Sequence, residues 1–138
     1  MTGVRPYFQS IMKDLGFDEW RKSLEPDNIP KSLIKKVYHL QIGSIQGLSQ
    51  NQQALDMSVS VTVSFLVSGG RDEMSGIEDA ERVALGIIRE AVSVSKKILA
   101  EGIVNVEFQS QTNEAISGRN DNLVLSRLTF SARVIISV

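Results

Sequence analysis

Residues 55–67 alternate almost strictly between apolar and polar side chains. Every odd position is apolar, and every even position except Leu66 is Asp, Ser or Thr. Successive side chains of a strand point to opposite faces, so this pattern predicts a half-buried β-strand with one hydroxyl-rich face. The strand would span roughly 43 Å, whereas a compact domain of this length has a diameter of roughly 37 Å. We therefore expect it to coil strongly or to run past the body into a neighbour, which favours an assembly protein over an enzyme.

Three other segments share the two-residue period and complete the expected strands. Residues 37–45, 104–109 and 128–138 each alternate between apolar and polar side chains, which is typical of strands with one buried face. The polar stretches 46–53 and 110–122 are expected to form loops, so that the four strands make two antiparallel hairpins.

The start of the last strand shows a change of phase. Leu123 and Leu125 lie in the opposite phase to the apolar residues that follow them from Leu128 onward. A slip of one residue between two alternating runs is typical of a β-bulge, which bends and twists a strand. The sequence therefore predicts a bulge near residues 125–127.

A long amphipathic helix is expected between the two hairpins. Apolar residues hold one face from Ile77 to Ile98, with the spacing of 3.6 residues that marks a helix. Ser75 precedes Glu78 by three positions, which is the capping-box pattern at a helix start. Gly102 is the expected C-terminal stop.

The N-terminal segment is also expected to be helical. Residues 8–15 place their apolar side chains on one face, and Gly16 follows as a natural stop. Residues 18–24 could add a short second helical turn. Pro26 and Pro30 then break any helix, because each proline restricts itself and the residue before it.

These elements predict an α+β fold. The expected architecture is a four-stranded, mainly antiparallel sheet of two hairpins, with the long helix between them and the N-terminal helix packed on one face. We expect a single domain over residues 1–138, in which an N-terminal helical segment, 1–29, precedes an α+β core, 30–138.

The composition removes several classes of function. The 15 basic and 16 acidic residues give a net charge of −1, so strong attraction to nucleic acid is not expected. The chain has no cysteine, which excludes thiolate catalysis, thiolate metal sites and disulfides. Neither a signal peptide nor a membrane-spanning segment is recognisable, so we expect a soluble, unexported protein.

The candidate chemical residues favour structural roles, and we expect no catalytic residue, metal or cofactor. His39 is the only histidine, so it lacks the partners that metal motifs need. The Gly-Gly-Arg-Asp sequence at 69–72 matches no phosphate-binding motif. Acidic residues gather between Asp72 and Glu81, where they match the positive end of a helix. They could also supply a general acid–base pair or bind a hard cation.

The layout resembles that of a known family. The shared features are the Ile-Pro and Tyr-His-Leu entry to the first strand at 29–30 and 38–40, the long alternating strand ending in Phe-Leu-Val at 65–67, and the Asp-Ala helix start at 79–80. A closing hairpin follows. In these respects the chain resembles the tail terminator, or tail-completion, proteins of long-tailed bacteriophages and the related minor tail proteins.

This resemblance implies a hexameric ring that sits on the last ring of the tail tube and stops its polymerisation. The implied partners are further copies of the chain, the tail tube protein and the head–tail connector or neck protein. No membrane and no specific nucleic acid are implied, although DNA can pass through such a ring. The implied location is the tail–head junction of the virion, after assembly in the host cytoplasm.

Subunit and partner contacts are expected along the edges of the long strands and in the two polar loops. The residues that we expect to take part are Thr62, Ser64, Gln50, Gln52, Arg71, Asp72, Arg119 and Asn120.

Two other interpretations remain open. The first is a tail tube, neck or head-completion subunit of similar fold, which would form open-ended fibres if it polymerises without closing. The second is a small α+β ligand-binding domain or enzyme that uses the carboxylates near Asp72 to Glu81. Such a protein would be a stable monomer or dimer with an apolar cleft.

Overall fold

The computed structural model describes residues 3–50, 54–68, 73–93, 103–118 and 121–137. They form the helices α1 (Val4–Asp14) and α2 (Glu73–Ala91), the 3₁₀ turn η1 (Pro26–Asn28), and the strands β1 (Asp18–Glu19), β2 (Val37–Gln50), β3 (Ala54–Ser68), β4 (Ile103–Gly118) and β5 (Asp121–Ser137).

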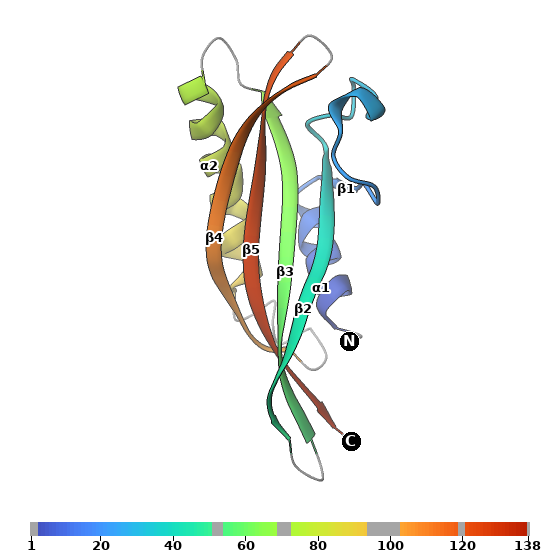
Figure 1. The fold of residues 1–138 in the computed structure, drawn as a ribbon, viewed down its shortest axis with the longest axis vertical. Helices are drawn as coiled ribbons and strands as arrows, with labels where there is room; N and C mark the ends of the chain where they lie inside the picture. The colour runs from blue at the N-terminus through green and yellow to red at the C-terminus, as the bar shows by residue number, and fades with distance from the viewer. Residues whose placement is uncertain (1–2, 51–53, 69–72, 94–102, 119–120, 138) are drawn as a thin grey trace.

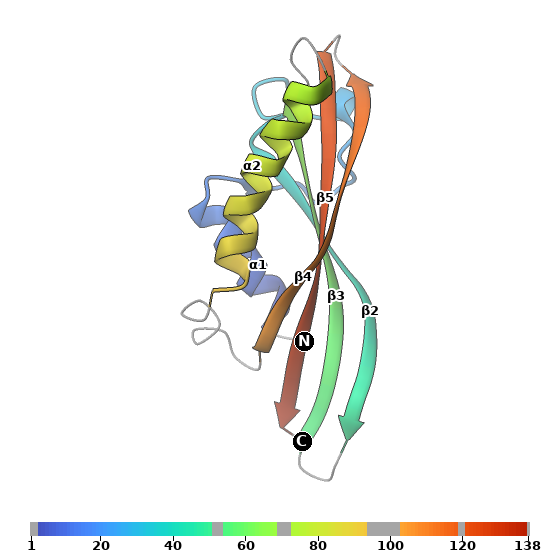
Figure 2. The same cartoon turned by 90° about the vertical axis from the view of Figure 1, so that its left-hand side faces the viewer.

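The strands form one sheet in the order β1-β2-β3-β5-β4. The hairpins β2–β3 and β4–β5 are joined by antiparallel pairing of β3 with β5. Both α-helices lie on the same face of the sheet (Figures 1 and 2). The fold therefore has the expected α+β class. The sheet, however, has five strands instead of four, and it is mixed because β1 runs parallel to β2.

The additional strand replaces the helical turn expected at residues 18–24. The backbone amide of Asp18 donates a hydrogen bond to the carbonyl of Lys36 at 2.8 Å, and that of Trp20 donates to the carbonyl of Tyr38 at 2.7 Å. The edge of β2 offers acceptors for these amides, and buried backbone groups must be paired. This long-range pairing therefore overrides the local periodicity.

The main core lies between the helices and the sheet. The odd-numbered side chains of β3 from 59 to 67 are buried there, as the alternation predicts. Phe130 of β5 lies opposite Val61 of β3. Its ring centroid is 5.3 Å from that of Phe8 in α1 and 5.7 Å from that of Phe108 in β4. These rings link α1 to the sheet at the centre of the core.

The end of α1 is fixed by local hydrogen bonds. The amide of Gly16 donates to the carbonyl of Lys13 at 3.0 Å, and that of Phe17 donates to the carbonyl of Met12 at 2.9 Å. These are the two bonds of a Schellman motif. The φ angle of Gly16 is 91°, which a residue with a Cβ adopts only with strain. Gly16 thus ends the helix as expected.

α2 differs from its expected bounds at both ends. It begins at Glu73, so Ser75 lies inside the helix and does not cap it. Glu and Met are good helix formers, which allows this extension. Its last residue is Ala91, so the expectation of one helix reaching Ile98 is wrong. Ile98 itself and the expected stop Gly102 lie outside the described residues.

The expected loops at residues 46–53 and 110–122 are largely strand. β2 continues to Gln50, and β4 continues to Gly118. In β4, residues 109–115 are exposed or half-exposed on both faces, so burial imposes no alternation on their sequence. Backbone pairing with β5 holds this segment in the sheet.

A second, smaller core covers the other face at one end of the sheet. Leu66 of β3 packs there with Leu123 and Leu125 of β5 and with residues that follow β1, namely Leu24, Ile29 and Ile34. The bulge expected near residues 125–127 is wrong, because β5 pairs with β3 in unbroken register. The change of apolar phase instead marks the place where both faces of the sheet are buried.

The far ends of β2, β3 and β5 project beyond the helices (Figures 1 and 2). β3 and β5 remain paired as far as Ala54 and Ser137. Near these strand ends, Ile45 and Ile135 are 51% and 37% exposed. The long strands therefore run past the body of the domain, and the expectation that they run into a neighbour stays a prediction.

Candidate functional site

The face of the sheet opposite the helices is rich in hydroxyl groups. We call it the open face. Ser60 of β3 lies opposite Ser131 of β5, and Thr62 lies opposite Thr129. The hydroxyl of Ser58 is 2.9 Å from that of Ser131. The hydroxyl-rich face that the alternation predicts is therefore present.

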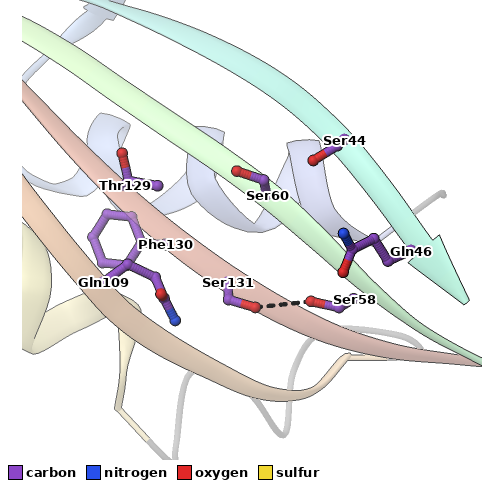
Figure 3. Close-up of a pocket in the computed structure, with 8 residues that line it drawn as sticks. All are labelled: Ser44, Gln46, Ser58, Ser60, Gln109, Thr129, Phe130 and Ser131. Carbon is purple, nitrogen blue, oxygen red and sulfur yellow. Dashed lines mark hydrogen bonds between the residues drawn. The ribbon is translucent and has the colours of Figure 1, made fainter. Parts of the chain in front are cut away.

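A shallow pocket of about 190 Å³ lies on the open face (Figure 3). Its lining residues come from four strands and are all uncharged: Ser44, Gln46, Ser58, Ser60, Gln109, Thr129, Phe130 and Ser131. Such a surface can exchange hydrogen bonds with neutral polar groups. A hydroxyl becomes a nucleophile only beside a base, and none of the lining side chains is one.

The two arginines of the open face are bound to carboxylates. The guanidinium of Arg133 donates two hydrogen bonds to Asp56, one of them from Nε to Oδ1 at 3.0 Å. These bonds hold the pKa of the Asp56 carboxyl below its usual value. Arg127 donates to Glu114 at 3.2 Å. Because each cation has a nearby anion, this face offers little net attraction to phosphate groups.

The sheet has a long open edge on each side, formed by β2 beyond the short strand β1 and by β4. β1 pairs with β2 only at Val37 and Tyr38, so β2 is without a partner on that side from Leu40 onward among the described residues. β2 contains no charged residue and no proline, and β4 carries only Glu107 and Glu114 as charges. Soluble proteins usually protect such edges with charges or proline.

Register shifts do interrupt both edges. In β2 they lie between Ile42 and Ile45 and after Gly47. In β4 the second shift ends at Ser110, so residues 110–118 form an unbroken stretch of edge. Bulges twist an edge and limit pairing at their own position. The regular stretches between them remain available.

A cleft of about 430 Å³ adjoins the free edge of β2. We call it the β2 cleft. It is lined by α1, β1 and β2 through Arg5, Gln9, Glu19, Arg21, His39, Leu40, Gln41 and Ile42. Glu19 accepts a hydrogen bond from Gln9 at 2.7 Å and lies 3.4 Å from Arg5. Both contacts hold β1 against α1.

His39 has a structural contact within this cleft. Its Nδ1 lies 2.9 Å from the backbone carbonyl oxygen of Trp20, which ties the start of β2 to the segment after β1. The indole Nε1 of Trp20 is buried and has no hydrogen-bond partner among the residues that the structure describes. The described residues contain no group of three or more His, Cys, Asp or Glu side chains that could hold a metal ion.

The residues expected at interfaces are only partly described. Thr62 is half-buried on the open face, and Ser64 is 8% exposed and so contributes little surface. Gln50 ends β2 and pairs with Leu55, but its side chain is not described. The remaining expected residues lie outside the described ranges: Gln52, Arg71, Asp72, Arg119 and Asn120.

The acidic residues near the start of α2 do not form a recognisable site among the described side chains. Glu78, Asp79 and Glu81 are exposed on the helix. Asp79 lies 3.4 Å from Arg82, one turn further along. Asp72 lies outside the described residues. Solvent-exposed pairs of this kind are common on helix surfaces and contribute little to stability.

Comparisons with known proteins add no assignment. No protein-family model matches the sequence, and no curated protein matches it either. In the part of the chain that the structure describes, neither helix has the length and hydrophobicity needed to cross a bilayer.

Proposed function

We propose that this protein is a non-enzymatic assembly subunit that joins copies of itself into a closed ring, as the tail terminators of long-tailed phages do. The observation that supports the proposal is the pair of open sheet edges. β2 carries no charged residue along its length, and β4 carries two. An edge without protecting charges is a template for pairing with another chain.

The topology favours pairing between different edges. Each step from β2 through β3 and β5 to β4 is antiparallel, so β2 and β4 run in opposite directions. A neighbour related by rotation would therefore present its β4 to β2 in antiparallel orientation, which is the more stable pairing. Each subunit would use two different surfaces, and such contacts form rings when the rotation closes.

In this proposal the ring contains six copies, caps the tail tube, ends its polymerisation and joins it to the head connector or neck protein. The ring would lie at the tail–head junction of the virion. An open face with neutralised arginines suits a channel that DNA must leave freely, because phosphate binding depends on unpaired cations. A tail tube or neck subunit could share all these features except closure.

The mass of the purified protein in solution tests the proposal, together with negative-stain images. A hexameric ring, or a monomer that becomes one when tail tubes are added, supports it. Open-ended fibres would replace the terminator role with that of a tube subunit. A monomer or dimer that does not assemble at high concentration or on tail tubes would overturn the assembly function.

A carboxylate placed on the free edge tests the proposed mode of association. Gln41 is exposed in β2, and Gln41→Glu should prevent ring formation, because a charge on an edge opposes pairing. Leu85→Glu is the matched control, since Leu85 is 63% exposed on α2. Both variants should melt close to the wild-type temperature, and only Gln41→Glu should remain monomeric.

A further inference from the structure

The β2 cleft carries more positive charge than the domain itself neutralises. Arg5 and Arg21 both line it, together with the single carboxylate of Glu19. Glu19 already contacts Arg5 and Gln9. Arg21 is exposed and has neither a hydrogen bond nor an ion pair with the residues that the structure describes. The cleft is therefore an exposed, positively charged slot beside a free strand edge.

The opposite edge of the same sheet has the complementary charge. Glu107 and Glu114 are the only charged residues of β4, and both are exposed. Glu107 lies opposite Ser131, and Glu114 lies opposite Leu125. Both positions share the phase of the open face, so the two carboxylates lie on one face of the outer strand. Glu114 is already paired with Arg127 at 3.2 Å, whereas Glu107 has no ion pair with the residues that the structure describes.

We infer that the β2 cleft receives β4 of a second copy of this chain, with Arg21 binding the carboxylate of Glu107. β1 pairs with β2 at only two residues, and the incoming strand would pair with the part of the β2 edge that β1 leaves unpaired. This inference rests on the proposed function and identifies the residues that would make the subunit contact.

The charge pattern also selects the symmetry of the contact. A two-fold contact that set one β2 cleft against another would oppose arginines, and a two-fold contact between two β4 edges that paired Glu107 with Glu114 would oppose carboxylates. Like charges juxtaposed across an interface weaken association. Only the contact of β2 with a neighbour's β4 pairs opposite charges, and this is the contact that can continue around a ring.

Charge reversal tests this contact. Arg21→Glu and Glu107→Arg should each weaken association by at least about tenfold, judged from like-charge repulsion at interfaces. Combining both changes in one chain should restore assembly, because every contact then again pairs an acid with a base. Assembly is measured by sedimentation across a range of protein concentrations.

Lys31→Glu is the matched control, because Lys31 is exposed and does not line the cleft. It changes the net charge as Arg21→Glu does and should assemble like the wild type. The melting temperature of each variant establishes that it folds. Raising the salt concentration should weaken wild-type association, since exposed ion pairs are screened.

The outcomes distinguish this inference from the proposed function. Wild-type rings together with normal assembly of Arg21→Glu would overturn the inference and leave the assembly function intact. Loss of assembly in Arg21→Glu that Glu107→Arg does not rescue would also overturn it, because Arg21 would then contact another group. A wild-type protein that never associates would overturn both.

Discussion

Val61 lies in the middle of β3, and its side chain is 0% exposed on the helix-facing side of the sheet. Its cross-strand neighbours are Ile42 in β2 and Phe130 in β5. We predict that Val61→Asp unfolds the protein at neutral pH, because it places a carboxyl group in the main core with no polar partner.

The size of the effect follows from two costs. Losing the buried valine costs about 1.5–3 kcal/mol. Full burial raises the pKa of a carboxyl by up to about 3–5 units, and each unit corresponds to about 1.4 kcal/mol. Together these costs reach about 6–10 kcal/mol, which is comparable with the whole stability of a typical domain, about 5–15 kcal/mol.

The charge part of this cost should depend on pH. A raised folded-state pKa means that the penalty is absent below the unfolded value, about 3.9, and grows as the pH rises towards the folded value. Circular dichroism without denaturant, recorded between pH 4 and pH 7 with the wild type at each pH as reference, measures this as a folded fraction that falls as the pH rises. Val61→Asn is polar but cannot ionise, so its destabilisation should be the same at both pH values.

Thr62→Asp is the control for the face assignment, because Thr62 is the next residue and points to the open face. It should cost only about 1 kcal/mol, the range of strand propensities. If Thr62→Asp were as destabilising as Val61→Asp, or if Val61→Asp showed no pH dependence beyond that of the asparagine variant, the assignment of buried and open faces would be wrong.

Three further predictions concern stability and titration. Leu66→Ala should lower the free energy of unfolding by about 2–5 kcal/mol, as truncations in a packed core do; a loss below 1 kcal/mol in urea denaturation would show that the second core contributes little. The pKa of the Asp56 carboxyl is lowered in the folded state, so its contact with Arg133 stabilises the fold at pH values above the ordinary pKa of 3.8, and this stabilisation is lost as the pH falls through the folded-state pKa. The free energy of unfolding of Asp56→Asn, measured in urea, should therefore depend less on pH in the acid range than that of the wild type. Burial raises the pKa of Tyr7 and of Tyr38 to about 12, so ultraviolet titration of the folded protein should show no tyrosinate until the pH approaches that value. The stability that the two protonated tyrosines contribute is present below pH 10 and is lost as the pH rises through the folded pKa. Ionisation near pH 10 without unfolding would contradict their burial.

The strongest parts of the sequence prediction were those where burial falls on one face only. β3 alternates because one of its faces meets the helices and the other meets solvent, and this placed Val61 and Thr62 correctly. The central part of α2 has a period near 3.6 for the same reason. In both elements the hydrophobic effect acts on a fixed geometry, so the pattern of side chains reports the structure directly.

Two kinds of segment could not be predicted in this way. Residues 110–115 of β4 are exposed or half-exposed on both faces, so nothing in their side chains distinguishes them from a loop. At Leu123 and Leu125 the change of apolar phase was visible in the sequence, but it was attributed to a β-bulge and not to a second buried face. An opposite phase can arise from a bulge or from a second buried face, and only the packing of residues after β1 distinguishes the two.

The candidate site shows the same division. The lack of charge in β2 is visible in the sequence, but it does not show that the strand lies at an edge, because edge strands usually carry protective charges. The β2 cleft was not visible, because Arg5, Arg21 and Gln41 come from three separate segments. They meet only because β1 pairs in parallel with β2 and Glu19 joins β1 to α1.

The sequence by itself determined which positions are apolar, and therefore the α+β class, the long strand β3 and its hydroxyl-rich face. The tertiary structure decided which polar segments form strands, which strand edges remain unpaired and which charged side chains lie next to those edges. The physical reason is that local periodicity records burial one element at a time, whereas edges and clefts arise from backbone pairing between segments that are distant along the chain.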